Sequence, residues 1–241
     1  AGALFSVEII LGDFGVAQFS PIVIASVMAT VVSRHFLGDF PAFQVPRYVL
    51  VSPFELIPYL ILGLLSGLVA LLFIKVLYGF EDFFDRLKIN GIMKPMLGGL
   101  IIGLMGIFVP DIYGVGYNSM NQALLGNLPW MTMLFLVFMK LFATSISLGS
   151  GGSGGIFAPS LFLGTMTGGF FGAIVNHLFP QYSATPGAYA LVGMGAVVAG
   201  ATHAPITAIL ISLCAGRDGG GCGWSYPCAD YRNSDHLRTD Q

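Results

Sequence analysis

Long apolar stretches dominate this 241-residue chain and constrain its fold more than any other feature. The clearest covers residues 54–77 and is long enough to cross a bilayer as one helix, which takes about 20 residues. Charged residues make up only 9% of the chain, against roughly 25% in an average soluble domain. The sequence therefore predicts an all-α, multi-pass integral membrane protein in contact with a lipid bilayer. The apolar stretches are 1–11, 19–32, 54–77, 96–109, 131–146, 156–178 and 189–213.

The same composition argues against several other classes of protein. A single soluble core could not hide 55% apolar residues, which argues against a soluble enzyme or a disordered chain. Ten Lys and Arg residues against twelve Asp and Glu residues give a formal net charge of -2, without the basic surface that nucleic acid requires. The three cysteines show no C-x-x-C spacing. We therefore expect no metal, no cofactor and no nucleic-acid partner.

Glycine and proline interrupt several stretches that are too short to cross a membrane alone. Such breaks are tolerated in a bilayer only where the freed backbone groups face protein or a water-filled path. Short, tilted, broken helices that meet near the midplane are typical of transporters and channels. Pairs of glycines four positions apart also predict close helix packing, within one bundle rather than at a dimer face. These pairs are Gly63/Gly67, Gly99/Gly103, Gly164/Gly168 and Gly168/Gly172.

The glycine-rich run 149–155 and the apolar stretch after it form the most informative segment. The pattern predicts a helix that begins just after Gly155, with Pro159 in its first turn, where the missing N–H is tolerated. The backbone N–H groups of Ile156 and Phe157 then lie at the positive end of the helix dipole, which makes an anion site without a cation. Partial charges bind an anion weakly enough to release it quickly. Further pore-lining candidates are Gly154, Gly155, Ala158, Pro159, Glu8 and Tyr117.

Two enzyme motifs also match this run. Gly149-x-Gly151-x-x-Gly154 has the spacing of a dinucleotide fingerprint, but neither a preceding strand nor an acidic residue about 20 positions later supports it. Gly151-x-Ser153-x-Gly155 matches a nucleophile elbow, and two histidines follow it, so an intramembrane serine protease is a remote alternative. We expect no enzyme, because no carboxylate is placed to orient either histidine. Those histidines are His177 and His203.

Several segments over about residues 1–212 resemble the voltage-gated chloride channel (ClC) family of channels and proton-coupled chloride exchangers. The segment 149–164 is similar to the family's Gly-Gly-x-Phe-Ala-Pro signature, and 114–117 is similar to its Gly-x-Gly-Tyr segment. Residues 190–196 and 202–210 resemble two late helices of the family, and residues 1–8 resemble the end of its first half.

The resemblance implies a homodimer with one anion pore in each subunit, built from two inverted halves. This chain would hold the end of the first half and most of the second, so the ion-conduction domain 1–212 would be partial and inactive alone. In the family, the amides of the signature Ile and Phe ligate the central chloride, a role that passes to Ile156 and Phe157. The family's Ser-bearing loop, gating Glu loop and late Tyr are not found in this sequence.

One departure from the family pattern bears on mechanism. Bacterial-type exchangers carry Phe-x-x-Glu-Glu where this chain reads Phe5-Ser-Val-Glu8-Ile9, and Ile9 cannot carry a proton. We therefore expect passive, voltage-gated-channel-like conduction of chloride, in the plasma membrane of a prokaryote. The alternative is a secondary transporter, either proton-coupled or selective for another anion such as fluoride or nitrate. Glu8 itself is either a pore-proximal acid or a helix-end residue satisfied by water or backbone.

The chain changes character near residue 213. Cys214, Cys222 and Cys228 fall in this last part, together with a cluster of charges that the preceding helices lack. One choice of codons for residues 224–233, read one base later, encodes an apolar helix of the family type. We therefore expect residues 213–241 to be an aberrant, frame-shifted and unstructured tail, with a genuine cytoplasmic tail as the alternative.

Lys140 lies inside an apolar stretch. A charge at such a position is a candidate for function, but a lysine near a helix end can also extend its ammonium to the membrane interface. The sequence does not choose between these two roles.

Overall fold

The computed structural model describes residues 8–9, 16–37, 43, 55–87, 91, 93–180 and 184–218. These residues form helices, turns and loops, and no strand occurs among them, which confirms the all-α prediction. The elements in chain order are α2 (Val16–Leu37), α3 (Leu56–Arg86), α4 (Met93–Phe108), η3 (Pro110–Ile112), α5 (Tyr117–Leu124), α6 (Trp130–Gly149), α7 (Phe157–Leu178), α8 (Pro186–Thr202) and α9 (Pro205–Asp218).

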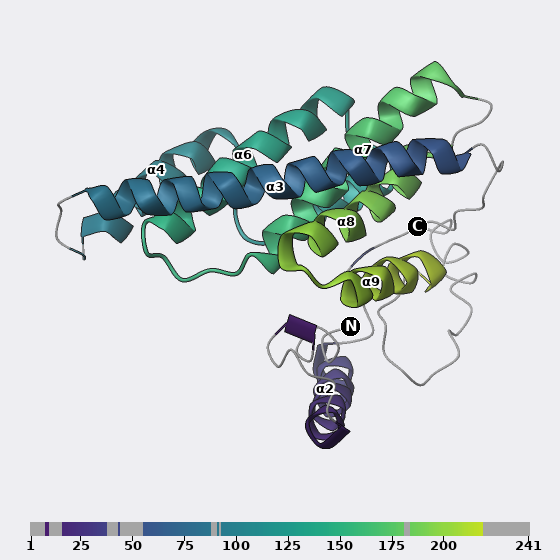
Figure 1. The fold of residues 1–241 in the computed structure, drawn as a ribbon, viewed down its shortest axis with the longest axis horizontal. Coiled ribbons are helices and arrows are strands. Elements are labelled where there is room, and N and C mark those ends of the chain that lie inside the picture. The colour runs from purple at the N-terminus through teal and green to yellow at the C-terminus, as the bar shows by residue number, and fades with distance from the viewer. Residues whose placement is uncertain are drawn as a thin grey trace, which may run out of the picture.

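α7 is the core element of the helix bundle. It packs most extensively against α8, and α6, α5 and α3 contact it as well. Of its apolar window, 67% is buried inside the protein, compared with 22% for α3. Figure 1 shows α3 as a long helix across the bundle and α2 lying apart from it.

α3 leaves a broad apolar face uncovered by protein. Leu60, Leu64 and Leu68 follow one another along this face, and each is at least 64% exposed. An apolar face of this size is unusual on a soluble monomer but suits the hydrocarbon of a bilayer. α3, α6 and α7 are each long and apolar enough to cross a membrane. The structure therefore agrees with the prediction of an integral membrane protein.

The apolar stretch 189–213 holds two helices, as the two segments 190–196 and 202–210 predicted. α8 ends at Thr202 and α9 begins at Pro205, because His203 takes a left-handed conformation with φ of 55°. Proline suits the first position of a helix, where no N–H is needed, so the chain restarts there in a new direction. The short helix α5, in contrast, was not predicted, since no apolar run marks it.

α9 continues to Asp218, past residue 213, where the tail was predicted to begin. That predicted boundary therefore does not coincide with the end of a helix. Residues 219–241, which carry most of the predicted tail, lie outside the described residues. The frame shift stays a prediction.

Candidate anion site at the start of α7

The loop before α7 first closes the end of α6. The N–H of Gly151 donates to the carbonyl of Leu148, and the N–H of Gly152 donates to the carbonyl of Ser147, both at 3.0 Å. These two bonds form a Schellman cap, in which Gly151 takes the left-handed position with φ of 89°. Two of the last carbonyls of α6 are thus satisfied within the loop itself.

α7 begins at Phe157, with Ile156 as its N-cap residue. The N–H of Ser160 donates to the carbonyl of Ile156 at 3.1 Å, which is the first bond of the helix. The N–H groups ahead of Ser160 therefore lie at the N-terminal end of α7, where the helix dipole is positive. The N-cap residue Ile156 forms no side-chain capping bond, and the first turn of α7 contains no acidic residue. The predicted positions of Ile156, Phe157 and Pro159 are confirmed, whereas their contact with an anion stays a prediction.

The backbone just before this helix end is open. Gly154, Gly155 and Ile156 are exposed, whereas Ala158 and Pro159 are partly buried. A Cβ atom built on Gly155 would meet no heavy atom within 4 Å, and Gly155 is not among the glycines with positive φ. Neither packing nor backbone conformation therefore requires glycine at this position. Close approach of a ligand to the backbone is a third reason for a glycine.

Tyr117, another pore-lining candidate, begins α5 directly after Gly116, which has φ of 79°. The Tyr117 ring is 46% exposed and meets the ring of Phe43 edge-on, at 5.5 Å between centroids. A Cβ atom on Gly116 would approach the Phe162 ring of α7 within 2.6 Å. The backbone just before Tyr117 therefore contacts α7 about one and a half turns after the start of α7.

Glu8 caps the N-terminus of α9. Its Oε1 accepts a hydrogen bond from the N–H of Ile206 at 3.1 Å, and its Oε2 accepts from the N–H and hydroxyl of Thr207 at 2.8 and 2.7 Å. The structure thus shows the helix-end role that was one of two expectations for Glu8. A pore-lining role stays a prediction. The residue before Pro205 is Ala204, whose side chain cannot cap a helix. This missing local cap is the sequence signal that a residue far away in the chain could cap α9.

Lys140 is buried within the protein, with only 4% of its surface exposed. Its ammonium donates to the carbonyls of Ile112 at 2.8 Å and Gly114 at 2.6 Å, and lies 5.2 Å from the centroid of the Phe162 ring. The ammonium therefore ends against protein carbonyl groups rather than in solvent.

The serine-protease alternative does not fit this geometry. A nucleophile elbow joins a strand to a helix, whereas Ser153 follows the helix α6. Within the described ranges, no hydrogen bond links Ser153 to His177 or His203. The residues that would form a catalytic pair are therefore not brought together.

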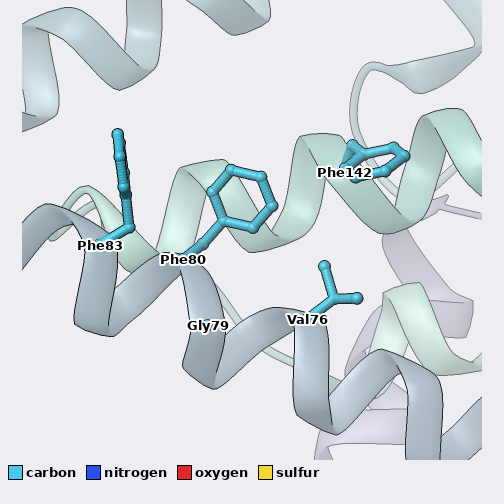
Figure 2. Close-up of a pocket in the computed structure, with 5 residues that line it drawn as sticks. All are labelled: Val76, Gly79, Phe80, Phe83 and Phe142. Atoms are coloured by element: carbon cyan, nitrogen blue, oxygen red, sulfur yellow. The ribbon is translucent and has the colours of Figure 1, made fainter.

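Figure 2 shows a pocket between α3 and α6 that is lined almost wholly by apolar atoms. The pocket is lined by the aromatic rings of three phenylalanines and by two further residues of α3. These are Phe80, Phe83, Phe142, Val76 and Gly79. No charged or hydroxyl side chain lines the pocket, so it offers hydrocarbon contact rather than donors for an anion. This pocket is not the candidate anion site.

A model of the voltage gated chloride channel family matches residues 1–215. A putative chloride channel protein ClcB-like of Ralstonia nicotianae is 36% identical over 211 residues, which are 88% of this chain and 49% of that protein. The H(+)/Cl(-) exchange transporter ClcA of Salmonella paratyphi B is 34% identical over 88% of this chain and 46% of that protein. The chloride channel protein CLC-f of Arabidopsis thaliana is 36% identical, with 88% of this chain and 30% of that protein covered.

A solved structure has the same fold. The crystal structure of a slow cyanobacterial Cl-/H+ antiporter matches with a TM-score of 0.78 and 28% identity, over 87% of this chain and 50% of the antiporter. The chain thus spans about half the length, or less, of the relatives it matches. Together with the helix order and the α7 start, these matches show that the chain belongs to the voltage-gated chloride channel family.

Proposed function

We propose that this chain is part of a membrane protein that transports chloride, with the anion held by the N–H groups of Ile156 and Phe157. The start of α7 carries the proposal. It combines a positive helix end, an N-cap residue that cannot cap through its side chain, a first turn without an acidic residue and an open glycine at 155. No Lys or Arg lies in residues 148–164, so partial charges rather than a full charge would hold the ion.

Passive conduction is the favoured mode, because Ile9 stands where a proton-relaying carboxylate would be needed. Proton-coupled exchange is the second candidate, and it is supported by the names of two relatives, an exchange transporter and an antiporter. The proposal includes a homodimer in the plasma membrane of a prokaryote, as the family resemblance implies. The exposed apolar side chains of α2, such as Met28 and Phe36, would then face lipid or the second subunit.

The test is ion flux through liposomes that contain the complete product of the gene. With a potassium chloride gradient and valinomycin, we expect chloride efflux without uphill proton movement. Proton movement driven by the chloride gradient would show that the protein is an exchanger and not a passive channel. Larger fluxes of fluoride or nitrate than of chloride would overturn the choice of anion.

A glycine variant tests the site itself. Gly155→Val would place a branched side chain on the backbone that approaches the anion, and we expect chloride flux to fall at least tenfold. Gly99→Val on α4 is the matched control, because a Cβ atom there also meets nothing within 4 Å. Equal fluxes in the two variants would contradict the site.

A further inference from the structure

We infer that Lys140 is a fixed positive charge that strengthens anion binding at the start of α7 without touching the anion. The inference rests on the proposed chloride site and adds a specificity residue to it. Lys140 belongs to α6, whereas the site lies on α7, so the charge would act through space.

Among the described residues, no carboxylate forms an ion pair that would compensate the charge of Lys140. Both of its hydrogen-bond acceptors are neutral carbonyls, those of Ile112 and Gly114. Lys94, in contrast, forms an ion pair with Asp85. Asp111, beside Ile112, accepts instead from the hydroxyl of Ser119 at 2.7 Å.

Burying an ammonium group costs more free energy than its hydrogen bonds to two carbonyl groups alone explain. Removing a charge from water costs more than its hydrogen bonds return unless a counter-charge is present. A neutral donor such as glutamine could bind both carbonyls at lower cost, because its amide group carries two N–H bonds. The positive charge itself therefore needs a reason, and a nearby anion supplies one.

Phe162 locates this charge relative to the site. The ammonium lies 5.2 Å from the Phe162 ring, which is fully buried on α7. Side chains on a helix lean toward its N-terminus, so this ring lies over the turn nearer the start of α7. Phe162 is five positions after Phe157, which is about 7.5 Å along the axis. Together with the 5.2 Å between the ammonium and the ring centroid, this rise puts the ammonium within roughly 15 Å of the candidate amides.

That separation sets the size of the effect. A unit charge about 12 Å away changes an anion binding constant by roughly twofold at a dielectric of 80 and tenfold at 20. A charge behind the site favours anions over cations, yet it forms no direct contact that would trap the ion. The partial charges at the helix end and the distant full charge thus have complementary roles.

The experiment compares Lys140→Arg, Lys140→Gln and Lys140→Met in the complete gene product. Chloride binding is measured by calorimetry in detergent, and the half-saturating chloride concentration by efflux from liposomes. We expect Arg to stay within twofold of the native protein, and Gln and Met each to weaken chloride binding two- to tenfold. Lys94→Gln removes a partly exposed charge that is paired with Asp85 and serves as the control, with no change expected.

Two outcomes would overturn the inference. If Gln binds chloride as well as Lys while Met does not, Lys140 only positions the loop 112–114. If all variants bind equally, the charge has no influence on the site. Since Gln and Arg retain hydrogen-bond donors, both can be measured even where Met does not fold. If the native protein neither binds nor conducts chloride, it is the proposed function that fails.

Discussion

Three glycines in the loop between α6 and α7 differ in what they require. Gly151 needs its positive φ, and a Cβ atom on Gly152 would approach the Ser147 carbonyl within 2.6 Å. Gly155 has neither requirement. At the scale of single residues, the structure therefore separates two glycines that shape the loop from one that leaves the backbone accessible.

Alanine substitutions should separate these roles. We expect Gly151→Ala to lower the free energy of unfolding by about 1–2 kcal/mol, because a side chain is strained in the left-handed region. We expect Gly155→Ala to change it by less than about 0.5 kcal/mol. Unfolding in SDS, followed by circular dichroism, measures both. A larger loss for Gly155 than for Gly151 would show that Gly155 has a structural role.

The Glu8 cap gives a second residue-scale prediction. Glu8→Ala removes three hydrogen bonds from the start of α9, and loss of a cap typically costs about 0.5–2 kcal/mol. Thr207→Val removes only the hydroxyl bond and should cost less. Thermal unfolding in detergent tests this order. A Glu8→Ala variant as stable as the native protein would contradict the cap.

At the scale of elements, the α7–α8 contact depends on backbones that approach closely. A Cβ atom on Gly193 of α8 would come within 2.6 Å of the Gly164 carbonyl and 2.8 Å of the Gly168 Cα on α7. By contrast, a Cβ atom on Gly63 of α3 or Gly99 of α4 would meet nothing within 4 Å. Among the described residues, the predicted close packing is therefore seen for the glycine pairs of α7, and not for Gly63/Gly67 of α3 or Gly99/Gly103 of α4.

Gly193→Ala should destabilise the bundle by about 1–3 kcal/mol, because the added methyl group meets backbone that cannot turn away. Gly63→Ala is the matched control and should be neutral or slightly stabilising, since alanine favours helix more than glycine does. Unfolding in SDS compares the two variants. Similar stabilities would show that α7 and α8 can move apart at little cost.

Local patterns in the sequence predict some elements well. The start of α7 was predictable because a glycine run, Pro159 and an apolar stretch mark it within a few residues. The break between α8 and α9 was indicated by Pro205 and by the two segments 190–196 and 202–210, whereas the left-handed conformation of His203 has no local signal. The contact of Glu8 with Thr207 spans 199 positions, and that of Lys140 with Ile112 spans 28, so neither has a local signal.

For the molecule as a whole, the uncovered faces indicate which surfaces meet lipid. α3 carries exposed leucines along its middle, whereas its last turns carry Asp85, which pairs with Lys94. Apolar side chains in the middle and charges at the end are what a helix shows when it crosses the hydrocarbon and ends near the headgroups.

Spin labels attached to single cysteines can test this placement. The cysteines of the chain, at 214, 222 and 228, are first replaced by alanine so that only the introduced cysteine is labelled. A label at Leu64→Cys should be more accessible to oxygen than to a water-soluble nickel complex. A label at Asp85→Cys, near the helix end, should show the reverse. Electron paramagnetic resonance in liposomes measures both accessibilities. A Leu64 label that prefers the nickel complex would place this face of α3 in water.

The Schellman cap on α6 has an electrostatic consequence for its neighbour. α6 ends a few residues before α7 begins, so the negative pole of one helix adjoins the positive pole of the next. The amides of Gly151 and Gly152 donate to the oxygens of Leu148 and Ser147, so their partial positive charges offset part of the negative end of α6. The end of α6 would therefore repel an approaching halide less than the same helix end without its cap.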